Sequence, residues 1–387
     1  MKRYDSFTET QLNGITYILP FAQAQADSRK GISLNECGEF IWKLLADEIT
    51  FENVVKKCIA HFEADTPAEI ETVTDDVRNF ISQLESLGML SLGKPVPNET
   101  LPLSFESYFG RTACAFYGDT GELASYFCDF PANDNSVSKV PGLRVEFVYG
   151  PSGVNSPTET VLHNSEFVIS ASDTFYNILV PEIPEIREII LSKDGFLARF
   201  VMSSECTGAA AEKVFQVLRT VFLYSASLRG MYAIHSASIV YSGKAWLFSA
   251  YSGTGKTTHV NLWEDLYATP VYNGDLNLIG IGNGTCRVFP TPWCGTSEIS
   301  LNETYPLGGI FFLSRDTSDM VKEMSDERKL LNMWARSITP VWNPEMLEKE
   351  ISAYKEIIPN ILCADLHATM NPSAAHAAKE AVDAYLR

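Results

Sequence analysis

Ser252-Gly253-Thr254-Gly255-Lys256-Thr257-Thr258 is the segment from which most of the architecture of this 387-residue chain can be inferred. It follows an apolar run at residues 245–248 and precedes a helical pattern that ends near residue 266. The glycines let successive backbone N–H groups point to one side, and the following helix directs its positive end at the same place. A strand, a glycine-rich loop and a helix in this order predict a cradle for phosphate groups.

Two side chains of this segment are the expected phosphate and metal ligands. Lys256 would reach the β- and γ-phosphates of a nucleotide, and the Thr257 hydroxyl would coordinate Mg²⁺. The usual motif has a glycine five residues before Gly255, where this chain has Ala250. This departure leaves the lysine, the hydroxyl and the strand–loop–helix order in place. We therefore predict that residues 252–258 bind the phosphates of a nucleotide.

A site of this kind also needs an acidic side chain for the metal. Asp275 lies ahead of an apolar run at 276–279 and is predicted to be a metal ligand or a general base; the alternative is an ordinary Asn-Gly-Asp turn. His235 begins the strand pattern before the loop. A lone histidine is commonly a packed or surface residue, so the residues alone leave its role open. His259, beside the loop, is expected to serve packing.

Two further segments are candidates to border the site. The loop at 290–296 has two prolines at one end and Gly295 at the other, which suits either a substrate-facing loop or a plain turn. Cys294 in this loop is the cysteine that could line a site. Arg315 follows a buried-strand pattern and could meet phosphate or pair with an acid, and the second role is narrowly favoured.

The first 92 residues have the pattern of a small α+β module. Short strand patterns at 15–19 and 31–34 flank a polar turn, and three amphipathic helix patterns follow. The helices are expected at 36–46, 51–61 and 67–87. This order of elements predicts a winged-helix-like domain at residues 1–92.

The rest of the chain divides into a linker and two larger parts. The linker is expected at 93–103, where prolines follow the last helix pattern. Residues 104–206 alternate apolar and polar positions, which predicts a mostly antiparallel sheet. Residues 207–387 alternate strands and helices around the phosphate loop. We expect a multidomain protein of mixed α+β and α/β class, with a P-loop core as its C-terminal domain.

Composition and charge narrow the classes of partner. The chain is 45% hydrophobic and has no uncharged apolar run long enough to cross a membrane. Its formal net charge is −18 and its basic residues are not clustered, so nucleic acid and anionic membranes are poor partners. The eight cysteines lack metal-ligand spacing, and the first residues do not read as a signal peptide. We expect a cytoplasmic protein with reduced thiols; a homo-oligomer is left open.

The strand, the 252–258 loop and Asp275 together resemble the HPr kinase/phosphorylase group, which shares its nucleotide-binding core with ATP-dependent phosphoenolpyruvate carboxykinases. The resemblance covers roughly residues 209–387 and implies ATP and Mg²⁺, with phosphoryl transfer to a serine in the kinase branch. It also implies a site role for His235, because the family has a histidine just ahead of the loop strand. Many kinase members carry Asp-Asp where this chain has Gly274-Asp275. With two acids, one can serve as the base and the other as the metal ligand. This chain has a single carboxylate here and departs from that division.

The N-terminal part resembles PqqD-like elements, which bind leader segments of ribosomally made precursor peptides. The residues that carry this likeness are Ile32-Ser33-Leu34-Asn35-Glu36-Cys37-Gly38-Glu39-Phe40-Ile41-Trp42 and the stretch from Asp76-Val77 to Leu87-Gly88-Met89-Leu90. The resemblance implies that a peptide adds to the sheet edge formed by Gly31, Ile32, Ser33 and Leu34 and lies against the helix at 68–87. The alternative is a module that only packs or dimerises.

These features together predict a peptide-tailoring kinase. Residues 1–92 would hold the leader of a precursor peptide, and the C-terminal domain would transfer the γ-phosphoryl of ATP to a serine or threonine hydroxyl. Lys256 would stabilise the phosphates, and Asp275 or His235 would accept the hydroxyl proton. One alternative is a non-catalytic, ATP-responsive adaptor that presents the peptide to another enzyme. A second is a kinase of a small hydroxylated metabolite.

Overall fold

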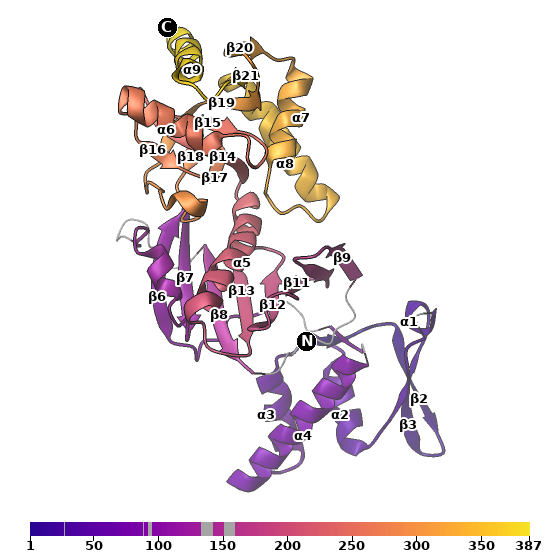
Figure 1. Ribbon diagram of the computed structural model, residues 1–387. Coiled ribbons are helices and arrows are strands. Elements are labelled where there is room, and N and C mark those ends of the chain that lie inside the picture. Colours follow the sequence, from indigo (N-terminus) through magenta and orange to yellow (C-terminus); the bar gives the residue numbers. More distant parts are fainter. Residues whose placement is uncertain (27, 88, 92–94, 133–141, 151–158) are drawn as a thin grey trace. The chain divides into compact units, whose positions relative to one another are not determined.

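The fold is taken from a computed structural model that describes residues 1–26, 28–87, 89–91, 95–132, 142–150 and 159–387 (Figure 1). Gly88 and residues 93–94 of the expected linker lie outside these ranges. The chain forms two compact units, Met1–Pro97 with Gly150–Lys193, and Asn98–Tyr149 with Asp194–Arg387. Both contain helices and sheets, so the protein is of mixed α/β type. The expected domains at 1–92, 104–206 and 207–387 stay a prediction.

Local sequence signals explain the three main helices of the first unit. These helices are α2 (Glu36–Leu44), α3 (Phe51–His61) and α4 (Pro67–Ser86). The Asn35 side chain caps α2 by accepting from the Gly38 N–H. At the start of α4, Thr66 and Glu69 each accept a backbone N–H from the other, as in a capping box. The apolar faces of these helices meet around Trp42, which is fully buried.

A three-stranded sheet in the order β2-β3-β4 belongs to the same unit. Its strands are β2 (Phe7–Leu12), β3 (Ile15–Pro20) and β4 (Ile32–Leu34), all antiparallel, and a short pair joins β1 (Lys2–Arg3) to β5 (Leu90–Ser91). The order places β4 at an edge of the sheet. Gly31 precedes β4, and a Cβ atom there would lie 2.6 Å from the Ile18 carbonyl oxygen. A glycine is therefore needed where the chain approaches β3. The short helix α1 (Gln23–Ala26) was not expected.

The remaining strands of the first unit form an antiparallel series. In chain order they are β9 (Glu159–His163), β10 (Val168–Ala171), β11 (Phe175–Leu179) and β12 (Ile186–Ser192). Each pairs with the next in an antiparallel ladder. These pairings agree with the mostly antiparallel sheet expected from the alternating pattern.

In the second unit, four strands follow the order β6-β7-β8-β13 and lie near a long helix. They are β6 (Leu103–Phe109), β7 (Thr112–Gly118), β8 (Leu143–Tyr149) and β13 (Leu197–Met202), and the helix is α5 (Gly208–Ser227). A 3₁₀ turn, η1 (Leu123–Phe127), follows β7. β8 pairs in parallel with both β7 and β13. The alternating pattern did not reveal these parallel pairings, because the side-chain period is the same in both kinds of ladder.

The C-terminal sheet of the second unit positions the candidate site. Its path is β15-β14-β17-β18-β19-β21-β20, and β15 also pairs with β19. The strands are β14 (Met231–Tyr241), β15 (Lys244–Ser249), β16 (Val271–Asn273), β17 (Leu276–Gly282), β18 (Thr285–Phe289), β19 (Tyr305–Arg315), β20 (Met320–Glu323) and β21 (Leu362–Ala368). β15, β19 and β21 run parallel, so their carboxyl ends meet at one edge. Ligands of α/β proteins commonly bind at such an edge.

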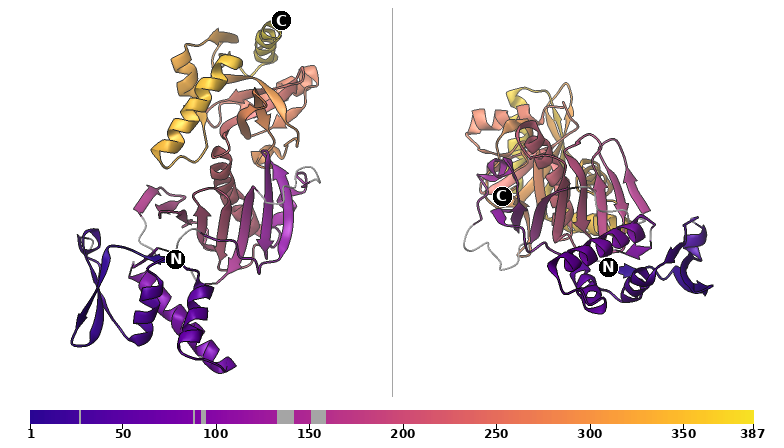
Figure 2. Two further views of the ribbon diagram at one scale, coloured as in Figure 1. Left: turned by 180° about the vertical axis from the view of Figure 1, so that it is seen from behind. Right: turned by 90° about the horizontal axis from the view of Figure 1, so that it is seen from below.

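Helices cover both faces of this sheet (Figure 1 and Figure 2). They are α6 (Lys256–Tyr267) and α9 (Pro372–Tyr385) on one face, and α7 (Asp326–Arg336) and α8 (Pro344–Ile357) on the other. Along β15, Trp246 and Phe248 join the core beneath α6, whereas Leu247 joins the core beneath α8. Strands buried on both sides read as continuous apolar runs, as residues 245–248 do. No helix of the described residues is long and apolar enough to span a membrane.

Candidate functional site

The glycine-rich loop connects β15 to α6 as expected. Gly253 has a φ of 74° and Gly255 a φ of 118°, both in the region that favours glycine. A Cβ atom on Gly255 would also lie 2.5 Å from the Cε atom of Met370. Ala250 does not have a positive φ, so the backbone does not require a glycine there. This explains how the loop tolerates the departure from the usual motif.

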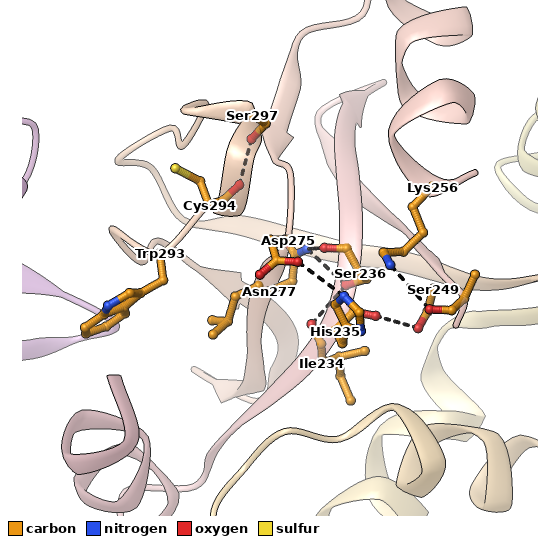
Figure 3. Close-up of polar contacts among 12 residues, drawn as sticks. Ile234, His235, Ser236, Ser249, Lys256, Asp275, Asn277, Trp293, Cys294 and Ser297 are labelled. Carbon is orange, nitrogen blue, oxygen red and sulfur yellow. Dashed lines mark hydrogen bonds and ion pairs between the residues drawn. The ribbon is translucent and has the colours of Figure 1, made fainter. Parts of the chain in front are cut away.

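Lys256 begins α6, and its ammonium group lies over the loop. Its Nζ atom donates to the Ala250 carbonyl at 3.4 Å (Figure 3). Burial lowers the pKa of Lys256, the nearby Arg336 lowers it further, and the carboxylate of Asp275 opposes both effects. The lysine therefore lies close to a second cation and to one acid. Such a cation is suited to offset the charge of a phosphate chain.

His235 and Asp275 contact each other beside the loop. The Nε2 atom of His235 lies 3.2 Å from Oδ1 of Asp275 (Figure 3). The strand register explains the approach, because His235 of β14 is opposite Leu276, the residue after Asp275. The hydrogen bond with His235 lowers the pKa of Asp275 most; burial opposes this, and the charges of His235, Arg219 and Lys256 add to it. The carboxylate is thus stabilised in its ionised form.

A pocket of about 360 Å³ brings most of the predicted residues together. Lys256, Asp275 and His235 line it. The other residues that line it are Ser252, Gly253, Gly255, Thr257, Thr258, Gly274, Thr296, Ser297, Arg315 and Met370. Of the predicted segment 252–258, Thr254 alone is missing from this wall. Its carbonyl instead accepts from Arg315.

Arg315 contacts the loop itself. Its guanidinium donates to the carbonyl of Gly253 at 2.6 Å and to that of Thr254 at 3.2 Å. Pairing with an acid was the narrowly favoured expectation for Arg315, but its guanidinium bonds these loop carbonyls instead, and its side chain lines the pocket. Arg315, the last residue of β19, thus ties the loop to the end of this strand.

The loop at 290–296 borders the pocket through Thr296, and Ser297 follows it. Cys294 is not among the lining residues, and its sulfur points away from Asp275 and Lys256 (Figure 3). Burial, more than the nearby acids, raises the pKa of the Cys294 thiol. A Cβ atom on Gly274 would overlap the Ser297 side chain. Gly274 therefore lies directly against this serine.

The buried cation Arg336 was missed by the sequence reasoning. Its guanidinium lies 3.7 Å from the ring centroid of Tyr251 in the loop, and the residue is only 8% exposed. Its Nε atom has no hydrogen-bond partner among the described residues. Ser337, the next residue, bridges to Ile234, which precedes His235. Because Arg336 ends a helix far along the chain, no local signal links it to the loop.

The oxygen donors present fit Mg²⁺. Thr257 and Asp275 line the same pocket and supply a hydroxyl and a carboxylate, which are ligands that Mg²⁺ prefers. No group of three or more His, Cys, Asp or Glu side chains that could hold a metal occurs in the described parts of the chain. Mg²⁺ commonly binds through one or two protein oxygens together with substrate phosphates. A site completed by a nucleotide is therefore consistent with these residues.

Comparisons with known proteins match parts of the chain. Residues 25–90 match the family model of coenzyme PQQ synthesis protein D (PqqD), which confirms the PqqD resemblance for these residues. Among solved structures, TbiB1 in complex with the TbiA(beta) leader peptide is 23% identical; the match covers 25% of this chain and all of that one, with a TM-score of 0.20. The HPr(Ser) kinase/phosphatase from Coxiella burnetii is 10% identical, with 40% and 93% covered and a TM-score of 0.23. No curated protein matches the sequence.

Proposed function

We propose that this chain is an ATP- and Mg²⁺-dependent kinase that phosphorylates a serine or threonine of a ribosomally synthesised precursor peptide. The observation that carries the proposal is the pocket lined by the glycine-rich loop, Lys256 and the His235–Asp275 pair. It combines groups that bind phosphate with groups that can accept a proton. Phosphoryl transfer depends mainly on positioning and on stabilising charge, which these groups supply.

The phosphates would bind between the loop and the start of α6. The N–H groups of the first turn of α6 have no partner within the helix and point toward the loop. Lys256 would contact the β- and γ-phosphates, with Arg336, which lies against the Tyr251 ring, as a second nearby cation. Thr257 and Asp275 would hold Mg²⁺, which when bound would offset negative charge on the phosphates.

The acceptor hydroxyl would approach from the side of His235 and Asp275. The side chains of this pair are 30% and 32% exposed, so an incoming group can reach them. The hydroxyl proton would pass to Asp275 or His235 as the oxygen attacks the γ-phosphorus and ADP leaves. Thr296 and Ser297 line the same end of the pocket and would contact the residue that carries the hydroxyl.

Peptide recognition is assigned to the PqqD-like residues. We propose that the leader adds as a strand to the edge of the sheet formed by β4, using Gly31, Ile32, Ser33 and Leu34. The backbone groups on the open side of β4 supply the hydrogen bonds for such an addition. Holding the leader raises the local concentration of the attached core peptide at the kinase site.

The test uses the full chain, γ-labelled ATP and a precursor peptide encoded beside its gene. We expect label on a serine or threonine of the peptide, loss of labelling in Lys256→Ala, and competition by excess leader peptide. ATP binding without transfer would instead support the adaptor. Labelling of a small hydroxylated compound that excess leader does not reduce would support the metabolite kinase. If Lys256→Ala labels the peptide as well as the unsubstituted chain does, the peptide kinase, the adaptor and the metabolite kinase are all contradicted, because each requires the loop to bind ATP.

A further inference from the structure

We propose that Asn273 is a positioning residue that fixes Asp275 and the loop at 291–300 relative to each other. Its buried amide would thereby shape the acceptor side of the pocket, which is the wall formed by Asp275, Thr296 and Ser297 where the acceptor hydroxyl would bind. The catalytic part of this inference rests on the proposed function, whereas its structural part does not. Asn273 ends β16 and is 1% exposed. It lies behind the pocket wall and is not itself a lining residue.

The amide oxygen of Asn273 holds the backbone of Asp275. Its Oδ1 atom accepts from the N–H groups of Asp275 and Leu276, both at 2.9 Å. The carbonyl of Asp275 accepts from the N–H of Ser236 at 3.0 Å. The backbone of Asp275 is therefore held on both sides, and its carboxylate can meet His235 only while this turn is kept.

The amide nitrogen of Asn273 holds the loop. Its Nδ2 atom donates to the Trp293 carbonyl at 3.2 Å, the Ser300 hydroxyl at 3.1 Å and the Thr291 carbonyl at 3.4 Å. Ser300 in turn donates to the Thr291 carbonyl at 2.6 Å. These bonds close the base of the segment that carries Thr296 and Ser297 into the pocket. The same segment contacts Asp275, because a Cβ on Gly295 would lie 2.8 Å from the Cβ of Asp275.

Only a neutral amide can make both sets of bonds at this position. An aspartate offers acceptors alone, so it would keep the bonds to Asp275 and Leu276 but would face the loop carbonyls without a donor. An alanine would lose both sets and leave buried backbone groups unpaired. Comparing the two substitutions therefore distinguishes the effect of losing the bonds to the loop from the effect of also losing the bonds to the turn at Asp275.

Asn277 offers a matched control. It is also fully buried, donates to the Ser236 carbonyl at 2.6 Å and accepts from the Ser238 hydroxyl at 2.6 Å. These hydrogen bonds, and a further one to the Ser236 hydroxyl, involve strand β14 and not the loop at 291–300. Asn277→Ala should therefore destabilise the chain to an extent similar to Asn273→Ala but leave the loop at 291–300 in place; it is a control for the loop alone, because Ser236, which Asn277 holds, also bonds the Asp275 carbonyl.

The experiment compares Asn273→Ala, Asn273→Asp and Asn277→Ala by hydrogen exchange and by steady-state kinetics. In Asn273→Ala we expect faster exchange in peptides covering 274–277 and 291–300, and kcat at least tenfold lower with the KM for ATP within about twofold of the starting value. In Asn273→Asp, exchange should rise in 291–300 alone, and the KM for the peptide should rise more than in Asn277→Ala.

Unchanged exchange in both segments of Asn273→Ala, or an equal rise of exchange in 291–300 in Asn277→Ala, would overturn the proposal. If the unsubstituted chain transfers no phosphoryl group, the proposed function fails, and the exchange measurement decides the positioning role by itself.

Discussion

Nε2 of His235 lies 3.2 Å from Oδ1 of Asp275, and the pair shares a pocket with Lys256. His235 lies within β14, and Asp275 lies in the turn that immediately precedes β17. The histidine stabilises the charged form of the acid, and the lysine does so more weakly. A carboxylate held in this way is ready to bind a cation or to accept a proton.

Replacing Asp275 by asparagine should strongly reduce phosphoryl transfer. The amide would keep the shape of the side chain but could neither accept a proton nor offer a charged ligand, so we expect kcat to fall by about 10²-fold or more. Initial rates of peptide labelling measure this. Asp265→Asn, at an exposed acid on α6, is the control and should keep the full rate. A normal rate in Asp275→Asn would remove Asp275 from the chemistry.

Arg336 should contribute to nucleotide affinity. It is a buried cation whose charge lowers the pKa of Lys256, so a bound polyanion would relieve the repulsion between the two groups. We expect Arg336→Met to weaken ATP binding by about ten- to a hundredfold, the size of a lost hydrogen bond to a charged group. Isothermal titration measures the affinity. Arg328→Met, which removes an exposed arginine of the same helix, should leave it unchanged; equal losses would argue against a specific role.

Local patterns were sufficient for the parts of the site that lie close in sequence. The strand before Ser252, the loop and the helix from Lys256 were placed correctly, because apolar runs and glycines report on the nearest residues. Asp275 was found from its position before a buried strand. His235 needed the family resemblance, because nothing in its own surroundings distinguishes it from a packed histidine.

Contacts between distant segments could not be predicted in this way. Arg336 and Met370 reach the loop only because β14, β19 and β21 bring their elements together. The strand β2 was missed because only Phe7 of its six residues is buried, which leaves no alternation to detect. In the sequence Asn273 looked like part of a turn. Its side chain also bonds a loop some twenty residues later, and that contact has no local signal.

The edge of β4 should bind the leader through backbone hydrogen bonds. In an added antiparallel or parallel strand, every second N–H of the peptide faces the partner strand. We expect that N-methylation at alternate leader positions weakens binding by about tenfold in one register and hardly at all in the other. Fluorescence anisotropy with a labelled leader measures this. Equal tolerance of both registers would exclude strand addition and favour a side-chain groove.

Glu350 should make the free energy of unfolding depend on pH. It is fully buried, Ser337 and Tyr354 donate to its Oε1, and its Oε2 has no hydrogen-bond partner in the described part of the structure. Burial raises the pKa of Glu350 above its usual 4.5, although these hydrogen bonds oppose the effect. The folded chain then holds a proton that the unfolded chain has released. Stability from this group is therefore complete below about pH 4.5 and declines as the pH rises through the raised pKa.

Glu350→Gln should remove this dependence, because the neutral amide can still accept from Ser337 and Tyr354 through its oxygen. We expect the variant to be more stable than the unsubstituted chain near pH 7, by on the order of 1 kcal/mol, and equally stable near pH 4.5. Urea unfolding at a series of pH values measures the difference. The control is Glu348→Gln, at an exposed position of α8; its free energy of unfolding should vary with pH as that of the unsubstituted chain does. A Glu350→Gln variant that loses stability at neutral pH would show that the charged form of Glu350 is the one that the fold requires.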